Sequence, residues 1–188
     1  MRIEPAEGAD VSRLADLWVD LATEQRDHGT HLLPEGNRST VHQDLMRRTI
    51  TGDVLVARGS PGEDGSDARS EGDGADGDDI VGFVSFAMET SGYDQDVERG
   101  MIFNIYVVPE HRGEGVGSRL LAAAEGRLTE AGADVVALEA MADNEAARRF
   151  YRRKGYDEHR VEMEKRVGIG GQDADSTDRD PAGEDADP

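Results

Sequence analysis

Cysteine is absent from the 188-residue sequence, which excludes disulfide bonds, thiolate metal ligands and cysteine nucleophiles. Long apolar runs are absent too: no stretch approaches the ~20 apolar residues of a membrane-spanning helix. The start of the chain, MRIEPAEGAD, has no apolar run of signal-peptide length. We therefore expect a cytoplasmic protein that has no membrane partner.

Lysine is scarce, since 19 of the 21 basic residues are arginine. Against these stand 41 acidic residues, which gives a formal net charge of −20. Such a charge repels nucleic-acid phosphates at ordinary salt, so we expect no nucleic-acid partner. An acidic excess with so little lysine is typical of proteins that work in concentrated salt, where the Debye length is ~3 Å at 1 M and self-repulsion is screened. The composition thus predicts an acidic, halophilic protein.

Two acidic segments differ in composition from the rest of the chain. Residues 59–79 hold six glycines and eight carboxylates and have no large apolar residue, while residues 167–188 hold seven carboxylates. Segments of this kind cannot bury enough apolar surface to fold, and the first does not match the register of an EF-hand calcium loop. We predict one domain over residues 1–166, with a disordered acidic insertion at 59–79 and a disordered tail at 167–188.

The remaining sequence shows the apolar periodicities of strands and helices in turn. The strands on either side of the acidic insertion are expected to pair as a hairpin, and Thr40 with Gln43 fits a capping box at the start of the second helix. The order βααβββαβαβ predicts an α/β fold with a mixed sheet. The predicted strands are 2–4, 53–58, 80–89, 101–108, 135–141 and 156–165, and the predicted helices are 10–28, 40–51, 115–131 and 144–154.

A glycine-rich turn lies in VVPEHRGEGVGSRLL, residues 107–121, between a predicted strand and a predicted helix. Unpaired amides at the positive end of a helix bind anions, and glycine leaves room for the ligand. A Walker loop is excluded because Gly117 is followed by Ser118 instead of lysine. The sequence also lacks, in either register, the third glycine of the GxGxxG fingerprint of dinucleotide-binding sites, so the match to that fingerprint is weak. A purely structural turn remains the alternative to a phosphate site.

Two motifs together carry a resemblance to a known family. Arg112, Gly115 and Gly117 stand in RxxGxG spacing, and NEAARRFYRRKGY, residues 144–156, follows them. Both resemble the cofactor segments of the GCN5-related N-acetyltransferase (GNAT) superfamily, and the likeness extends over residues 1–166. It implies the GNAT fold, whose central mixed sheet is splayed to admit the cofactor. It also implies acetyl-coenzyme A (acetyl-CoA) as cosubstrate without a metal, and a primary amine of a small molecule or a protein N-terminus as acceptor.

The resemblance also implies roles for individual residues. Tyr151 matches the family tyrosine that protonates the leaving thiolate. Glu139 lies in LEA, which is similar to the LEV segment of the N-terminal acetyltransferases of ribosomal proteins, and is implied as the general base; Glu89 is the alternative. The implied cofactor-binding residues are Val107, Val108, Arg112, Gly113, Gly115, Val116, Gly117, Ser118, Asn144 and Tyr151.

Structural explanations exist for several of these residues. Core packing would explain the two valines and Tyr151, and a helix N-cap would explain Asn144. A non-catalytic acyl-CoA binding or sensing domain would keep the glycine turn, although the presence of Tyr151 argues against it. Residues 24–37 are expected on the acceptor side, where Arg26, His28 and His31 would suit an acidic acceptor. A homodimer is left open, because dimers are common in the family.

Overall fold

The computed structural model describes residues 1–59, 80–90 and 94–167. Within these residues the chain forms one five-stranded sheet in the order β1-β2-β3-β4-β5. Apart from Gly59 and Val167, the two segments predicted to be disordered lie outside the described residues. The strands are β1 (Arg2–Pro5), β2 (Val54–Arg58), β3 (Ile80–Met88), β4 (Arg99–Val107) and β5 (Val135–Leu138).

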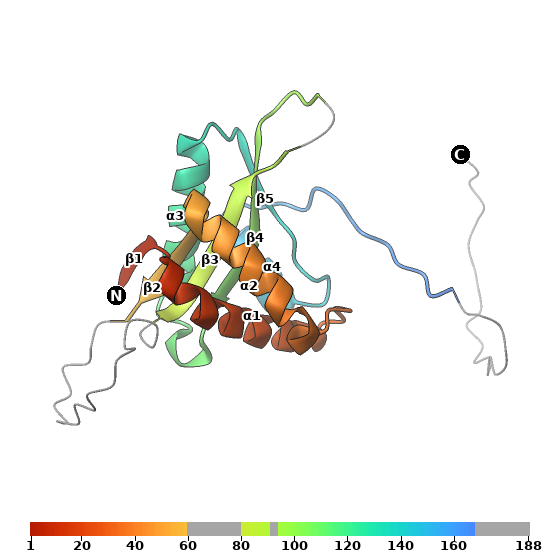
Figure 1. Cartoon of the computed structure of the whole chain (residues 1–188). Coiled ribbons are helices and arrows are strands. Elements are labelled where there is room, and N and C mark those ends of the chain that lie inside the picture. Colours follow the sequence, from red (N-terminus) through yellow and green to blue (C-terminus); the bar gives the residue numbers. More distant parts are fainter. Residues whose placement is uncertain (60–79, 91–93, 168–188) are drawn as a thin grey trace, which may run out of the picture.

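The sheet is mixed, as predicted. β1 to β4 are antiparallel neighbours, which confirms the hairpin of β2 and β3, and β5 pairs with β4 in parallel. Four α-helices cover the sheet among the described residues (Figure 1). They are α1 (Val11–Arg26), α2 (Pro34–Thr51), α3 (Val116–Glu130) and α4 (Glu145–Arg152), with 3-10 turns η1 (Gly8–Asp10) and η2 (Pro109–His111).

The core has two layers because strand side chains alternate between the faces of the sheet. Val54 and Val56 of β2 pack with α1 and α2, whereas Leu55 and Ala57 pack with α3. The aromatic side chains of α4 also pack against the α3 layer. The sheet therefore separates α1 and α2 on one face from α3 and α4 on the other, and the predicted α/β fold class is confirmed.

One predicted boundary and one predicted strand are wrong. The second helix begins at Pro34, not at Thr40, because proline at the first helical position needs no hydrogen bond for its missing N–H. The capping box with Gln43 therefore does not form, and Thr40 lies inside the helix. The final strand predicted at residues 156–165 is absent from the described residues: the chain after α4 is extended but joins no sheet.

The sheet splits between β4 and β5. Their parallel pairing ends at Ile102 and Leu138, yet β4 continues to Val107. At the same point the register between β3 and β4 shifts and leaves Phe103 as the extra residue of a bulge. A bulge bends its strand and increases the local twist. One edge of the second half of β4 is therefore without a strand partner among the described residues.

A tight approach of β3 to β4 requires glycine at position 82. A β-carbon there would lie 2.6 Å from the carbonyl oxygen of Tyr106 and 3.3 Å from Leu120 Cδ1. We expect Gly82→Ala to lower the free energy of unfolding by roughly 1–3 kcal/mol, because a backbone atom must move. The matched control is Gly126→Ala on the exposed face of α3, where no atom lies within 4 Å. That change should stabilise the protein by about 0.5–1 kcal/mol. Chemical denaturation at constant salt measures both, and equal effects would contradict the close approach.

Candidate active site

The glycine turn presents a row of unpaired amides at the start of α3. The backbone N–H groups of residues 113–118 donate no hydrogen bond to any described residue, and the next amide, that of Arg119, donates to the carbonyl of Gly115 at 3.1 Å. Gly113 and Gly115 have φ angles of 83° and 82°, which a side chain would strain. Unpaired amides at the positive end of a 15-residue helix favour an anion.

The main chain of β4 beside the split offers a second set of free groups. The amide of Val108 donates to the carbonyl of Val81 at 2.9 Å, so Val108 faces β3. Hydrogen-bonded residues alternate along an antiparallel strand, and the N–H and C=O of Ile105 and Val107 therefore face away from β3. The carbonyl of Val107 also accepts a hydrogen bond from Arg112 Nε at 2.8 Å.

The prediction that adjacent residues Val107 and Val108 both offer their main chain to the cofactor thus needs a correction. Adjacent residues of a strand turn their backbone groups to opposite edges, so Ile105 and Val107 share the free edge and Val108 does not. Sequence reasoning missed Ile105. Because residues two apart on a strand turn their main-chain groups to the same edge, counting back two positions from Val107 would have identified Ile105.

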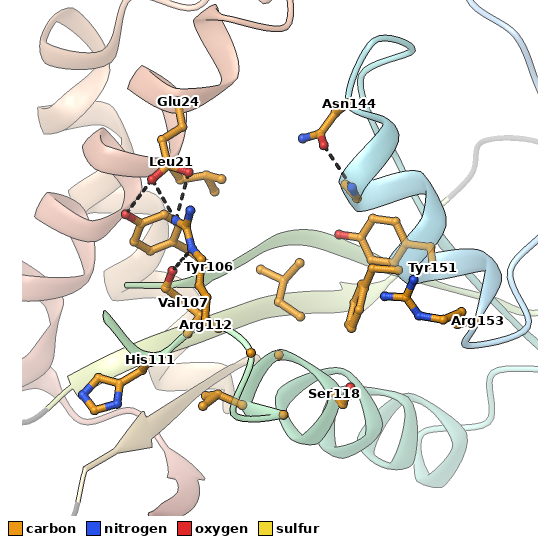
Figure 2. Close-up of a pocket in the computed structure, with 17 residues that line it drawn as sticks. Leu21, Glu24, Tyr106, Val107, His111, Arg112, Ser118, Asn144, Tyr151 and Arg153 are labelled. Carbon is orange, nitrogen blue, oxygen red and sulfur yellow. Dashed lines mark hydrogen bonds and ion pairs between the residues drawn. The ribbon is translucent and has the colours of Figure 1, made fainter. Parts of the chain in front are cut away.

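A cavity of about 500 Å³ opens at the split, between α1, β4, the start of α3, and α4 (Figure 2). This volume falls in the range of small-molecule sites, ~300–1,000 Å³. Of the predicted cofactor-binding residues, only Val108 does not line it. Those that do are Val107, Arg112, Gly113, Gly115, Val116, Gly117, Ser118, Asn144 and Tyr151.

Arg112 is held by α1. Its Nη2 donates to both carboxylate oxygens of Glu24, at 2.7 and 2.9 Å, and its guanidinium lies 5.3 Å from the centre of the Tyr106 ring. The Tyr106 hydroxyl donates to Glu24 as well, at 3.2 Å. Burial, followed by the nearby charges of Glu24 and Asp20, raises the pKa of Tyr106 to about 12. Arg112 therefore braces the turn against α1 and β4. Glu24, the first residue of the segment expected on the acceptor side, lines the same cavity as the glycine turn.

Tyr151 projects from α4 into the cavity, and Figure 2 shows its hydroxyl directed toward the opening. Its ring makes edge contacts with Phe150 and Tyr156, with centroids 5.2 and 5.9 Å apart. Among the described residues its hydroxyl has no hydrogen-bond partner. Burial raises the pKa of Tyr151 to about 12. The phenol is thus neutral at ordinary pH and can donate a hydrogen bond into the cavity.

Two further residues come from the ends of α4. Asn144 is its N-cap, and the side-chain oxygen accepts from the amide of Ala147 at 2.9 Å, so the capping role is present. Arg153 follows the helix and lines the cavity, with no ion pair to any residue in the described ranges. Sequence reasoning missed Arg153, since RRK in a helix is usually a solvated face.

Glu139 lines a smaller adjoining cavity of about 40 Å³, with Leu21, Ile105 and Tyr151 lining both spaces. The alternative, Glu89, lines neither and forms an ion pair with Arg99 at 2.8 Å. Geometry therefore favours Glu139 over Glu89 beside Tyr151, although its role as a base stays a prediction.

The part of the chain that the structure describes holds no candidate metal centre and no membrane-spanning helix. No group of three or more histidine, aspartate or glutamate side chains there could hold a metal ion. In the same residues, no helix combines the length and apolar character of a bilayer span.

Comparison with known proteins gives a family match. Residues 65–156 match the model of the acetyltransferase (GNAT) family. The chain is 39% identical over 67 residues to N-alpha-acetyltransferase 30 of Schizosaccharomyces pombe, covering 33% of this chain and 45% of that protein. It is 36% identical over 78 residues to the aminoalkylphosphonate N-acetyltransferase of Salmonella typhimurium, covering 42% and 50%. The chain thus spans half or less of the length of these curated relatives.

Solved structures share the fold over most of the chain. A GCN5-related N-acetyltransferase from Ralstonia eutropha superposes with a TM-score of 0.64 at 21% identity, covering 88% of this chain and 97% of that one. An acetyltransferase from Trypanosoma brucei gives 0.55 at 18% identity, covering 88% and 99%. Identities this low speak for the fold alone, and the family match adds the sequence relationship. The chain belongs to the acetyltransferase (GNAT) family.

Proposed function

We propose that this protein is an N-acetyltransferase that moves an acetyl group from acetyl-CoA to a primary amine by direct attack. The observation that supports it most is the row of unpaired amides at residues 113–118, at one end of a cavity of about 500 Å³ in the split sheet. A diphosphate suits those amides, and an amide-bearing arm suits the outward main-chain groups of Ile105 and the amide of Val107. Arg153 adds positive charge for the phosphates.

The residues around Tyr151 suit acyl transfer. Acetyl-CoA supplies an electrophilic thioester carbonyl, and the amine forms the C–N bond as the C–S bond breaks. A primary amine with a pKa near ~10 is mostly protonated at neutral pH, so a proton must first leave. Because Tyr151, with a pKa of about 12, is a weaker acid than a thiol near ~8.5, it stabilises the leaving sulfur by a hydrogen bond. The nitrogen loses a second proton once the C–N bond has formed, and that proton supplies the net protonation of sulfur.

We assign the removal of the amine's proton to Glu139, directly or through water. Glu139→Gln is expected to lower kcat/KM by about tenfold or more at neutral pH. The loss should shrink as the pH approaches the pKa of the amine, since the neutral amine then forms without help. Glu89→Gln, outside both cavities, is the control and should keep its activity. A pH-independent loss in Glu139→Gln would remove it from the role of base.

Two experiments test the function as a whole. Acetyl-CoA should raise the melting temperature while NAD leaves it unchanged, because only a ligand of the native state stabilises it. Thiol release should then be scored with aminoalkylphosphonates, amino acids and peptide N-termini, which include the two acceptor classes that the relatives' names mention. Stabilisation without thiol release from any amine would favour the acyl-CoA binding or sensing domain. A melting temperature raised by NAD and not by acetyl-CoA would overturn both the acetyltransferase and the acyl-CoA binding domain.

The setting of the domain is also proposed. We place the acetyltransferase domain at residues 1–166, with 59–79 as an insertion, because Arg58 pairs with Ile80 and the ends of the insertion meet. The cosubstrate would place the enzyme in the cytoplasm. The net charge of −20 would make activity and stability rise with salt from dilute to molar concentration, as self-repulsion is screened. Measuring the melting temperature and thiol release from dilute to molar salt tests this dependence on salt.

A further inference from the structure

One amide side chain interrupts the apolar stretch MIFNIYVV, residues 101–108, at Asn104 of β4. Asparagine is depleted in strands, and a buried amide needs hydrogen-bond partners. Asn104 Oδ1 accepts from Trp18 Nε1 of α1 at 3.1 Å, and Asn104 Nδ2 donates to Ser85 Oγ of β3 at 2.9 Å. The exposed fractions of these partners are 8% for Trp18 and 0% for Ser85. Because an indole nitrogen can only donate, the two partners fix the orientation of the amide.

Asn104 directly follows the bulge at Phe103. Neighbouring side chains of a regular strand point to opposite faces of the sheet. Here two neighbours share a face, since Asn104 is bonded to α1 and the centre of the Phe103 ring lies 3.9 Å from Arg48 Cζ of α2. Alternation resumes with Ile105, which packs with the α3 layer. The extra residue therefore shifts the second half of β4 by one position relative to β3.

This shift decides which main-chain groups reach the split in the sheet. Asn104 and Ser85 are the first register partners after the bulge. If Phe103 rejoined the ladder, every later residue of β4 would turn to the other face of the sheet. The outward groups of Ile105 and the amide of Val107 would then face β3 instead of the split. The free edge thus depends on the register after the bulge.

The side chain of Asn104 favours the bulged register over the slipped one. In the slipped register its amide would turn away from Trp18, and Ser85 would lie opposite Ile105. The amide would enter the α3 face, which is apolar and includes Leu120. Buried polar groups without partners are costly, and here the amide and the indole N–H would both lose theirs. The hydrogen bonds of Asn104 therefore act as a lock on the register.

We propose that Asn104 is a positioning residue for acetyl-CoA. Its bonds to α1 and β3 hold the register in which the main chain of Ile105 faces the split and can bind the amide-bearing arm. Asn104 and Ile105 both line the smaller cavity beside Tyr151, whereas Asn104 does not line the larger cavity that holds the glycine turn. Asn104 thus acts on the arm and not on the diphosphate. This inference rests on the proposed function, because the arm belongs to acetyl-CoA.

The test compares acetyl-CoA with ADP, which has a diphosphate but no such arm, by isothermal titration at constant salt. Asn104→Leu removes the amide and is expected to weaken acetyl-CoA binding by about tenfold or more, because the arm's partners are misplaced. The affinity for ADP should change by less than about twofold. Ser85→Ala removes one of the two bonds and should cause a smaller loss, also with acetyl-CoA alone. It carries the same test if Asn104→Leu does not fold.

Val56→Ala is the control for lost stability. Val56 is buried on the same face of the sheet and lines neither cavity, so this change should leave both affinities unaltered. A double-mutant cycle then tests the lock itself. In the Asn104→Leu background, Ser85→Ala should weaken acetyl-CoA binding no further, because the bond between the two side chains is already gone.

Three results would overturn the positioning role while the proposed function stands. These are an Asn104→Leu variant with wild-type affinity for acetyl-CoA, equal losses of affinity for acetyl-CoA and ADP, and fully additive effects in the double variant. A wild-type chain that binds ADP but not acetyl-CoA would overturn the proposed function and this inference together.

Discussion

Replacing Tyr151 by phenylalanine is expected to lower kcat by about 100-fold or more while the affinity for acetyl-CoA changes less than about threefold. The change removes one hydroxyl, which is directed into the cavity and has no partner among the described residues, so no protein hydrogen bond is lost. The ring and its edge contacts with Phe150 and Tyr156 stay. Steady-state kinetics with a saturating amine and a binding isotherm for acetyl-CoA measure the two quantities.

Tyr156→Phe is the matched control. The Tyr156 hydroxyl donates to Glu125 at 2.8 Å, and this residue does not line either cavity. Loss of this hydrogen bond should lower the free energy of unfolding by about 1 kcal/mol and leave kcat unchanged. If both variants kept full turnover, Tyr151 would have no part in stabilising the leaving sulfur.

The pH dependence follows from the same phenol. Because burial raises the pKa of Tyr151 to about 12, the neutral form persists well above neutral pH, and Tyr151 should cause no alkaline loss of kcat below about pH 10. The folded pKa lies above the ordinary value near ~10, so the stability that burial of this phenol contributes is present below that value and lost as pH rises through about 12.

Gly115→Ala is expected to weaken acetyl-CoA binding by at least about tenfold, the equivalent of ~1.4 kcal/mol. Gly115 caps α3 with φ at 82°, a conformation that costs a residue with a β-carbon roughly 1–2 kcal/mol. Relaxation of that strain would move the amides of residues 113–118 out of line. Isothermal titration with acetyl-CoA measures the change.

Gly29→Ala separates strain from binding. Gly29 has φ at 91° and open space around it, but it does not line the cavity. Both alanine variants should lose similar stability, and only Gly115→Ala should lose affinity. Unchanged affinity in Gly115→Ala would contradict the role of the turn amides.

Local signals in the sequence determined much of this protein. The glycine turn, the NEAARRFY segment and the strand and helix periodicities each depend on neighbouring residues. They predicted the mixed sheet, and nine of the ten predicted cofactor-binding residues line the cavity. The predicted start of the second helix at Thr40 failed because Pro34 begins a helix as well as a capping box does. The final strand failed for a different reason: residues 156–165 pair with no strand among the described residues, and strand pairing depends on contacts outside the segment itself.

Contacts between distant residues were decided only by the tertiary structure. Glu24 meets Arg112 across 88 positions of sequence, and no local pattern links them. The bulge at Phe103 and the split between β4 and β5 fixed which main-chain groups of Ile105 and Val107 are free. The sequence by itself determined most of the strands and helices and the glycine turn, because those depend on local backbone preferences. The shape of the cavity depended on strand register and packing, which exist only once the whole chain has folded.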